Sequence, residues 1–283
     1  MFPKMMEITT KIGCSLNCRF CPQDLLVKSY CSIDNRKNTS EVIKMMSFNM
    51  FKKCIDKIPA SIDVHFSGMS EPWQNPECTK MILYAYNKGH SIHVYTTLQG
   101  MSRDDYLKIR DLELKSFVLH IPDSEYNSKF KITDSYLNLL RDVIKDTIDG
   151  RFKINYYSCH GSVHEAIKEL IIFSKIHVNN QMFDRAGNLH EEGITHSVEK
   201  KGKIICKWCG GNALDKNVLL PNGIVLLCCM DYGMTFPLGN LLKQNFDEIS
   251  EGKIKQYYRM LLESESTGKI LCRYCHRSLE VTD

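Results

Sequence analysis

Apolar and polar residues alternate along the chain with two periods, one typical of strands and one typical of helices. Six short runs rich in β-branched and aromatic residues have the length of strands and cover residues 7–12, 62–67, 91–97, 116–121, 152–157 and 176–183. Between these runs, apolar residues recur every three or four positions, as on one helix face, over residues 47–58, 76–88, 103–112, 134–147 and 162–174. Ser47 stands at the N-cap position of the first of these helices.

Strand and helix follow each other at intervals of about 30 residues, which is the length of a βαβ unit. Such units build a parallel sheet, and their right-handed crossovers curl it into part of a barrel or leave it as an open, doubly wound sheet. In both architectures the chemistry lies at the C-terminal ends of the strands. The pattern therefore predicts an α/β fold with a functional site at that edge.

The pattern changes after residue 184, and we expect a smaller second unit there. The next stretch is polar and contains glycine, as linkers do. Beyond it, strands at 217–220 and 224–228 form a predicted hairpin around Pro221-Asn222-Gly223, and a helix follows at 246–262. We therefore divide the chain into a partial barrel at residues 1–184, a linker at 185–205 and a C-terminal domain at 206–283.

Composition narrows the class of protein. The chain has 283 residues, of which 43% are hydrophobic and 25% charged, and this argues against a disordered chain. No apolar run approaches the roughly 20 residues of a membrane helix, and the N-terminus lacks the apolar core of a signal peptide. The net charge of +4 comes from dispersed basic residues, so no nucleic-acid-binding stripe is predicted. We expect a soluble, cytoplasmic protein.

The 13 cysteines are unusual for such a chain. A cytosolic protein has little use for disulfides, and an odd number at unequal spacings favours metal or cluster ligation. Cys14, Cys18 and Cys21 follow the first predicted strand with the spacing C-x3-C-x2-C. Three thiolates on one loop can hold a [4Fe–4S] cluster and leave one iron open. A zinc loop is the alternative, but zinc needs a fourth ligand, and the nearest candidate, Cys31, is ten residues away.

This cysteine spacing, with Phe20 before the third cysteine, resembles the signature of radical S-adenosylmethionine (SAM) enzymes. The resemblance implies a partial (βα)6 barrel in which the open iron binds SAM and a 5′-deoxyadenosyl radical is formed. The segment Gly68-Met69-Ser70-Glu71 after the second strand resembles the Gly-Gly-Glu-Pro motif of the family, with Ser70 in place of the second glycine. By the same resemblance, Thr96 and Thr97 at the end of the third strand are candidate cofactor contacts.

Other polar residues are candidates for the substrate site. His120 and Asp123 follow the fourth strand, where substrate contacts are expected, although Pro-Asp is also common at the start of turns. Arg185 lies where the barrel ends, and it either anchors substrate or forms a salt bridge at the domain junction. Cys159, at the end of the fifth strand, is the candidate hydrogen-atom donor if the reaction is an epimerisation.

A second group of cysteines lies in the C-terminal domain. The hairpin brings Cys209 near Cys228, and Cys272 and Cys275 add a chelating C-x2-C pair. Four cysteines close a tetrahedral site for zinc or for a [4Fe–4S] cluster, and spacing alone does not choose between them. The pattern resembles the SPASM and twitch extensions of radical SAM enzymes, which implies one auxiliary [4Fe–4S] cluster. Cys206 is the alternative first ligand, although Cys209 fits the family spacing better.

Four auxiliary ligands imply a closed cluster, which is suited to take an electron from a substrate radical. The architecture resembles that of the butirosin-pathway aminocyclitol dehydrogenases, which oxidise a hydroxyl group. We therefore expect an oxidoreductase that acts on a carbohydrate, cyclitol or glycan precursor and receives electrons from a flavodoxin or ferredoxin. The absence of a leader-binding segment before the first strand favours a small molecule. The alternatives are a peptide- or protein-modifying maturase, a sugar epimerase, and a non-enzymatic zinc or iron–sulfur scaffold.

Overall fold

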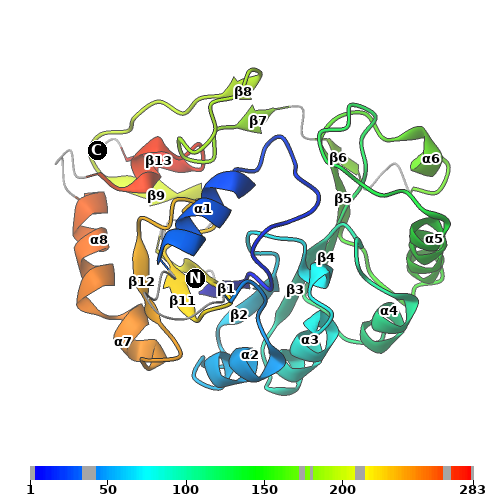
Figure 1. The fold of residues 1–283 in the computed structure, drawn as a ribbon, viewed down its shortest axis with the longest axis horizontal. Coiled ribbons are helices and arrows are strands. Elements are labelled where there is room, and N and C mark those ends of the chain that lie inside the picture. The colour runs from blue at the N-terminus through cyan, green and yellow to red at the C-terminus, as the bar shows by residue number, and fades with distance from the viewer. Residues whose placement is uncertain are drawn as a thin grey trace.

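The computed structural model describes residues 4–33, 43–171, 176–178, 181–207, 214–263 and 269–281. Its main feature is a curved sheet of nine strands in the order β12-β11-β10-β1-β2-β3-β4-β5-β6 (Figure 1). The parallel strands of the N-terminal half are β1 (Met5–Ile8), β2 (Asp63–Phe66), β3 (Ile92–Thr96), β4 (Ser116–His120), β5 (Tyr156–Cys159) and β6 (Ile176–Val178). Strands that are neighbours in sequence are neighbours in the sheet, which makes this half a partial barrel of βα units.

Helices connect the parallel strands, and α2 to α5 lie along the outer side of the sheet (Figure 1). The helices of this half are α1 (Gln23–Ile33), α2 (Phe48–Ile55), α3 (Cys78–Asn87), α4 (Arg103–Ile109), α5 (Asp134–Ile148) and α6 (Glu165–Lys168). Phe51 and Ile55 of α2 are buried in the same core as Val64 and Phe66 of β2. This apolar core lies between the helices and the sheet. The side chains on the opposite, inner side of the sheet are therefore not needed to form it.

Local signals set several element boundaries. Ser47 caps α2 as predicted, because its side chain accepts a hydrogen bond from the Met50 amide. The helix predicted at 246–262 is two helices, α7 (Phe246–Ser250) and α8 (Lys253–Glu263). A Cβ at Gly252 would collide with the Glu248 carbonyl oxygen, so the chain can turn there only with glycine.

Other predicted elements differ from the observed ones. The first strand ends at Ile8 rather than at residue 12, and the residues after it form the cysteine loop and the unpredicted helix α1. The run at 176–183 forms β6 and β7 (Met182–Phe183), and β7 pairs with β8 (Ile194–Thr195) outside the main sheet. Only α6 and a following turn are seen within the helix predicted at 162–174, whose last residues lie outside the described part of the chain.

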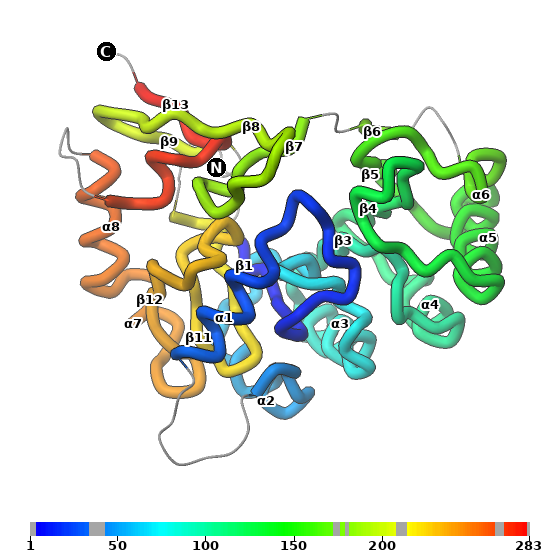
Figure 2. The backbone as a smooth tube through the Cα atoms, turned by 45° about the horizontal axis from the view of Figure 1, so that its top comes forward, coloured from blue at the N-terminus to red at the C-terminus, as the bar shows by residue number. Residues whose placement is uncertain are grey.

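The C-terminal part extends the barrel sheet. The strand β10 (Lys216–Leu219) pairs in parallel with β1, and β11 (Ile224–Leu226) and β12 (Pro237–Asn240) follow antiparallel, as predicted for the hairpin. Figure 2 shows these strands on the side of β1 away from β6. A small sheet of β9 (Ile204–Cys206) and β13 (Ser278–Glu280) packs beside the 3-10 turn η4 (Leu271–Tyr274). The division at residues 184 and 206 stays a prediction, since hydrogen bonds join the two parts into one sheet.

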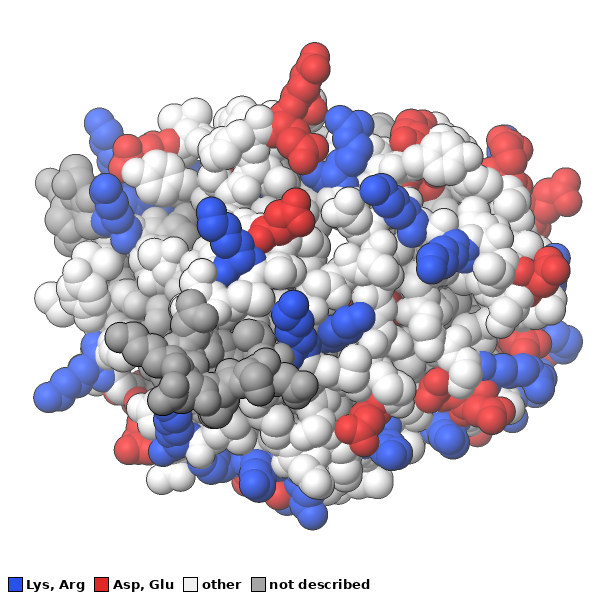
Figure 3. Space-filling view, viewed as in Figure 1, with Lys and Arg blue, Asp and Glu red and all other residues white. Residues whose placement is uncertain are grey.

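The surface carries charges of both signs. Figure 3 shows Lys and Arg side chains interspersed with Asp and Glu on the face turned to the viewer. This mixture agrees with the dispersed basic residues of the sequence and with its small net charge of +4. In the described part of the chain, no helix is both long enough and apolar enough to cross a membrane.

Candidate functional site

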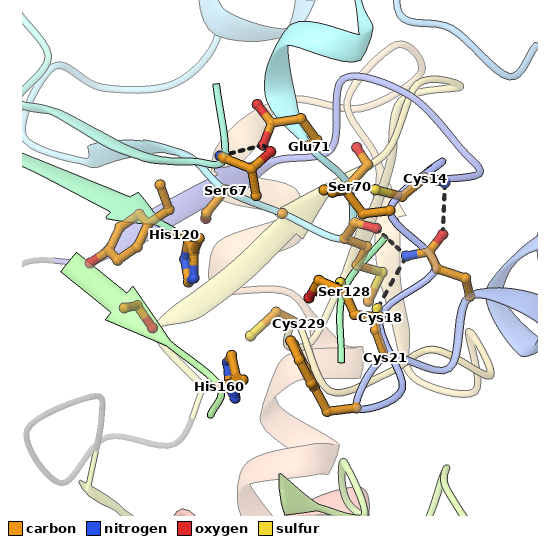
Figure 4. Close-up of a pocket in the computed structure, with 18 of the residues that line it drawn as sticks. Cys14, Cys18, Cys21, Ser67, Ser70, Glu71, His120, Ser128, His160 and Cys229 are labelled. Carbon is orange, nitrogen blue, oxygen red and sulfur yellow. Dashed lines mark hydrogen bonds between the residues drawn. The ribbon is translucent and has the colours of Figure 1, made fainter. Parts of the chain in front are cut away.

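A cavity of about 430 Å³ lies at the C-terminal ends of the parallel strands (Figure 4). The alternation of side chains along each strand decides which residues reach it. Tyr95 and Thr97 at the end of β3 line the cavity, whereas Thr96 between them does not. Tyr156 and Ser158 of β5 line it in the same way. These two strand ends therefore present hydroxyl-bearing side chains to the cavity, although barrels of this type are usually filled with branched apolar residues.

The cysteines of the N-terminal loop lie together at the cavity wall. Cys14, Cys18 and Cys21 are half-buried, and all of them line the cavity. The loop turns through Gly13 and Asn17, whose φ angles of 86° and 41° are left-handed and suit these residue types. Burial raises the pKa of the Cys18 thiol to about 12, so a bound metal ion is needed to hold a thiolate there at neutral pH. This donor set fits a [4Fe–4S] cluster with one open iron.

Side-chain donors surround the three sulfur atoms. Each sulfur lies near one polar side chain from the barrel: Ser128 Oγ at 3.0 Å from Cys18, Gln23 Nε2 at 3.3 Å from Cys21, and Gln74 Nε2 at 3.6 Å from Cys14. Gln23 also donates to the Met69 carbonyl oxygen at 2.6 Å and so ties the cysteine loop to the segment after β2. Outer donors of this kind orient metal ligands and tune the metal centre.

Gly68 allows the segment after β2 to approach the end of β1. Its φ is 48°, and a Cβ there would lie 2.6 Å from both the Ile8 carbonyl oxygen and Thr9 Oγ1. The hydroxyl groups of Ser67 and Ser70 line the cavity and have no hydrogen-bond partner among the described residues. These orphaned polar atoms fit a polar ligand such as SAM, at the place that the sequence resemblance implies.

Glu71 is fully buried, and its carboxylate ties two strand ends together. It accepts hydrogen bonds from the Thr96 hydroxyl at 2.6 Å and from the Thr97 amide and hydroxyl at 2.7 Å each. The Trp73 amide adds a bond at 3.3 Å. Burial raises the pKa of the Glu71 carboxyl, and these donors oppose the rise. The two threonine hydroxyls expected to meet the cofactor therefore bind Glu71, although Thr97 still lines the cavity.

Two neutral imidazoles form part of the cavity wall. His120, at the end of β4, lines the cavity, and burial lowers its pKa to about 4. His160, which the sequence patterns did not single out, lines it too and stacks on Phe20 with ring centroids 3.7 Å apart. Burial lowers the pKa of His160 to about 3. Asp123 also faces the cavity, but its Oδ1 already accepts hydrogen bonds from the Asn127 amide and side chain at 2.9 and 3.1 Å.

Arg185 reaches the cavity from a strained turn. Arg185, Ala186 and Gly187 have left-handed φ angles of 51°, 60° and 81°, and a non-glycine residue in this region costs about 1–3 kcal/mol. Arg185 Nε donates to the Phe20 carbonyl oxygen at 3.0 Å, and the guanidinium lies 5.9 Å from the centre of the Phe20 ring. No ion pair to Arg185 occurs among the described residues, so the expected alternative of a salt bridge at the junction lacks support.

A buried ion pair forms another part of the wall. Lys216 Nζ, on β10, lies 2.8 Å from Glu7 Oε1, on β1, and both residues line the cavity. Burial lowers the pKa of Lys216, but the Glu7 carboxylate outweighs this effect and raises it above the usual value. Sequence patterns missed the pair because its members meet only through the pairing of β1 with β10. His65 lines the same cavity and is 6% exposed, and its Nε2 has no partner in the described part of the chain.

Cysteines of the second group lie close together in the C-terminal part. Cys272 lies in the η4 turn and Cys275 directly follows it. The Ser278 hydroxyl lies within hydrogen-bond distance of the carbonyl oxygens of both cysteines and shares its one proton between them. A hydrogen bond with Cys229 and burial raise the pKa of the Cys228 thiol, and Cys272 is near enough to add to the rise. Cys272 and Cys275 are buried and Cys228 is half-buried, and thiols gathered in this way fit an iron–sulfur cluster.

The first ligand of the second group stays a prediction. Cys209 lies outside the described residues. Cys206 lies in β9 opposite Ser278 of β13, next to the η4 turn. Burial raises the pKa of the Cys275 thiol to about 11, and nearby Cys206 contributes. Cys206 is therefore close to the C-x2-C pair, which strengthens the alternative that the spacing rule ranked second.

Cys159 and Cys229 differ in whether they reach the cavity. Cys159, the expected hydrogen-atom donor, is 0% exposed, belongs to the apolar core and is not among the residues that line the cavity. This corrects the expectation, because Ser158 takes the inward position of β5. Cys229, which the sequence patterns did not single out as a site residue, lines the cavity. Figure 4 shows it between the cysteine loop and the two imidazoles of His120 and His160.

Comparisons with known proteins place these features in context. Residues 206–276 match the SPASM family model, described as an iron-sulfur cluster-binding domain. A comparison with curated protein sequences finds no match. The structure of BtrN in complex with AdoMet and 2-DOIA is 17% identical, has a TM-score of 0.59 and covers 98% of this chain and 94% of that chain.

Two further solved structures are similar as well. The structure of anSMEcpe with bound AdoMet is 14% identical with a TM-score of 0.56 and covers 97% of this chain and 86% of that chain. The structure of Streptococcus suis SuiB bound to precursor peptide SuiA is 13% identical with a TM-score of 0.51 and covers 91% of this chain and 67% of that chain. At identities this low, the structural similarity establishes the fold alone, which is a partial barrel with a C-terminal extension. Together with the SPASM match, they support the resemblance to radical SAM enzymes and a site for SAM and iron–sulfur clusters.

Proposed function

We propose that this chain, which resembles radical SAM enzymes with a SPASM-type domain, oxidises a hydroxyl group of a small carbohydrate- or cyclitol-type molecule. The observation that carries the proposal is one cavity that joins the three-cysteine loop to orphaned polar groups and to Cys229, the neighbour of an auxiliary cysteine. When bound, SAM and the first cluster supply a 5′-deoxyadenosyl radical for hydrogen abstraction, and the second cluster supplies an electron acceptor.

The side chains of the cavity bind and orient the reactants. In our proposal Cys14, Cys18 and Cys21 hold the first cluster, and the Gly68–Glu71 segment, with the orphaned Ser70 hydroxyl, holds SAM. Arg185 directs its guanidinium at the substrate. An N–H donor of this kind stabilises the negative charge on the substrate hydroxyl oxygen as its proton passes to solvent water. Loss of this proton, of one hydrogen atom from carbon and of one electron gives the ketone.

The lining of the cavity favours a polyol-like substrate. A volume of about 430 Å³ suits a small molecule. Neutral His120 and His160 and the Lys216–Glu7 pair offer both donors and acceptors, which match hydroxyl and amino groups. The similarity to the BtrN structure, which contains 2-DOIA as well as AdoMet, supports a small molecule. The similarity to SuiB bound to a precursor peptide keeps a peptide maturase as the alternative.

Epimerisation is the second candidate, and the position of Cys229 favours it. In this reaction the Cys229 S–H bond breaks, its hydrogen atom forms a new C–H bond at the substrate radical, and a thiyl radical remains. The thiyl radical then takes one electron and one proton to restore the thiol. We propose a ferredoxin or flavodoxin as the one-electron donor, both here and for the first cluster. Cys229 lines the cavity at the required place, whereas Cys159 does not.

Anaerobic reconstitution with iron and sulfide tests the cofactor assignment. The wild-type chain should bind about eight irons, and a Cys272→Ala/Cys275→Ala variant about four. That variant should still form 5′-deoxyadenosine from SAM and dithionite, whereas Cys18→Ala should not. About four irons in the wild type, or zinc bound by the C-terminal cysteines, would refute the two-cluster assignment.

Incubation with a panel of cyclitols, aminocyclitols and sugars in D2O separates the two reactions. Oxidation should lower the product mass by two hydrogens and should persist in Cys229→Ala. Epimerisation should place one solvent deuterium on carbon and should disappear in Cys229→Ala but not in the control Cys159→Ala. Turnover of peptides alone, with every small molecule inert, would contradict both candidates.

A further inference from the structure

The loop of residues 228–232 connects the two cysteine groups. It begins with Cys228 of the second group, continues with Cys229 in the cavity and ends with Tyr232 against the first group. The Tyr232 hydroxyl lies 3.4 Å from Cys21 Sγ, and Tyr232 is 4% exposed. One short segment of the C-terminal part therefore contacts the predicted ligand of the catalytic cluster.

The loop is held firmly in this position. The Asn188 side chain donates to the Met230 carbonyl oxygen at 2.8 Å. The Asp231 carboxylate accepts hydrogen bonds from the amides of Thr235 and Phe236, each at 2.8 Å. The Tyr232 ring packs in a small apolar cluster that includes residues of α1 and of the segment after β2. The hydroxyl therefore has little freedom to move away from the sulfur.

The donor and the acceptor of the hydrogen bond between Tyr232 and Cys21 are defined when the sulfur is a metal ligand. A ligating thiolate has no proton, so the Tyr232 hydroxyl must be the donor. Hydrogen bonds to cluster sulfurs withdraw negative charge and stabilise the reduced state, and this raises the reduction potential. Gln23, Ser128 and Gln74 make similar contacts from the barrel, whereas Tyr232 comes from the C-terminal part.

We propose that Tyr232 is a positioning residue through which the C-terminal part raises the reduction potential of the cluster held by Cys14, Cys18 and Cys21. The inference rests on the proposed function, because it needs a cluster at this loop. It goes further by giving the C-terminal part a second role besides holding an auxiliary cluster. Loss of the hydroxyl makes the first cluster harder to reduce, while iron content and the auxiliary cluster stay unchanged.

A potentiometric titration followed by electron paramagnetic resonance tests this role on the reconstituted full chain. The signal of the first cluster is identified by its change on addition of SAM. In Tyr232→Phe, the reduction equilibrium of this signal should shift about tenfold towards the oxidised form, which is 59 mV for a one-electron couple. Ser128→Ala, which removes the shorter contact to Cys18, should shift it in the same direction.

Tyr136→Phe is the matched control, because Tyr136 is 5% exposed and its hydroxyl has no hydrogen-bond partner among the described residues. This variant should leave the midpoint unchanged. Replacing Tyr232 with 3,5-difluorotyrosine keeps the ring and strengthens the donor, and it should raise the midpoint even if Tyr232→Phe folds poorly. An unchanged midpoint in both Tyr232 variants would overturn this inference alone. A wild-type chain without any SAM-responsive cluster signal would overturn the proposed function as well.

Discussion

Replacement of Glu71 by glutamine tests how the motif after β2 is supported. The carboxylate accepts four hydrogen bonds, three of them at 2.6–2.7 Å, and two of the donors are the backbone amides of Trp73 and Thr97. A glutamine has one acceptor oxygen, so its NH2 group must face one of these two amides. The variant therefore leaves a buried N–H group without an acceptor, whichever way the side chain is turned.

The size of the effect follows from these bonds. A buried donor without an acceptor costs about 1–3 kcal/mol, and each remaining bond loses roughly 1 kcal/mol when the acceptor loses its charge. Part of this loss is offset, because burial disfavours the charged carboxylate and raises its pKa. We expect Glu71→Gln to lower the free energy of unfolding by about 2–3 kcal/mol, which corresponds to a fall in Tm of about 3–5 °C for a chain of this length.

Thermal unfolding of the apo chain at pH 7, followed by circular dichroism, measures this change. Glu113→Gln makes the same substitution at an exposed position and should leave Tm unchanged. Thr96→Val removes one donor to the same carboxylate, so the double variant with Glu71→Gln should lose less than the sum of the single losses. A Tm for Glu71→Gln within 1 °C of the Glu113→Gln value would refute the reasoning.

Three further variants and profiles test other parts of the site. Gly68→Ala should lower the free energy of unfolding by about 2–4 kcal/mol in chemical denaturation, because the added Cβ collides with β1 in addition to the left-handed strain. The control Gly89→Ala, at φ 89° with its nearest contact at 3.8 Å, should lower it by only about 1 kcal/mol. Equal losses in the two variants would contradict the collision. Arg185→Lys should lower kcat/KM for the substrate about 10–100-fold, because lysine lacks the planar donor fork, and an unchanged value would remove Arg185 from the site. Burial holds the pKa of His120 near 4 and of His160 near 3, so neither should titrate in the kcat/KM profile between about pH 5.5 and 8. An inflection near pH 6.5 that is lost in His160→Asn would contradict this.

Local patterns predicted the parts of the fold that depend on neighbours in sequence. The first five runs each overlap one strand, with ends that differ by up to four residues, and the sixth run holds two strands, β6 and β7. Ser47 caps its helix. The spacing of Cys14, Cys18 and Cys21 places three thiols on one loop at the cavity wall. The SPASM match at residues 206–276 agrees with the second cysteine group.

Predictions that needed the facing direction of a strand residue were less secure. Cys159 and Ser158 are adjacent, and a shift of one residue in the expected strand exchanges which of them faces the cavity. The same alternation separates Thr96 from Thr97. Strand ends read from a sequence are uncertain by more than one residue, so the facing direction at an end cannot be read from them.

What the sequence determined by itself is the local chemistry: the strand and helix pattern, the three-cysteine loop and the C-x2-C pair. The tertiary structure decided which distant residues meet. Lys216 joins Glu7 because β10 pairs with β1, and the same pairing carries Cys229 to the cavity and Tyr232 to Cys21. Periodicity describes which side of an element is buried, but it contains no information about which strand lies beside which. Those contacts come from the packing of the whole sheet.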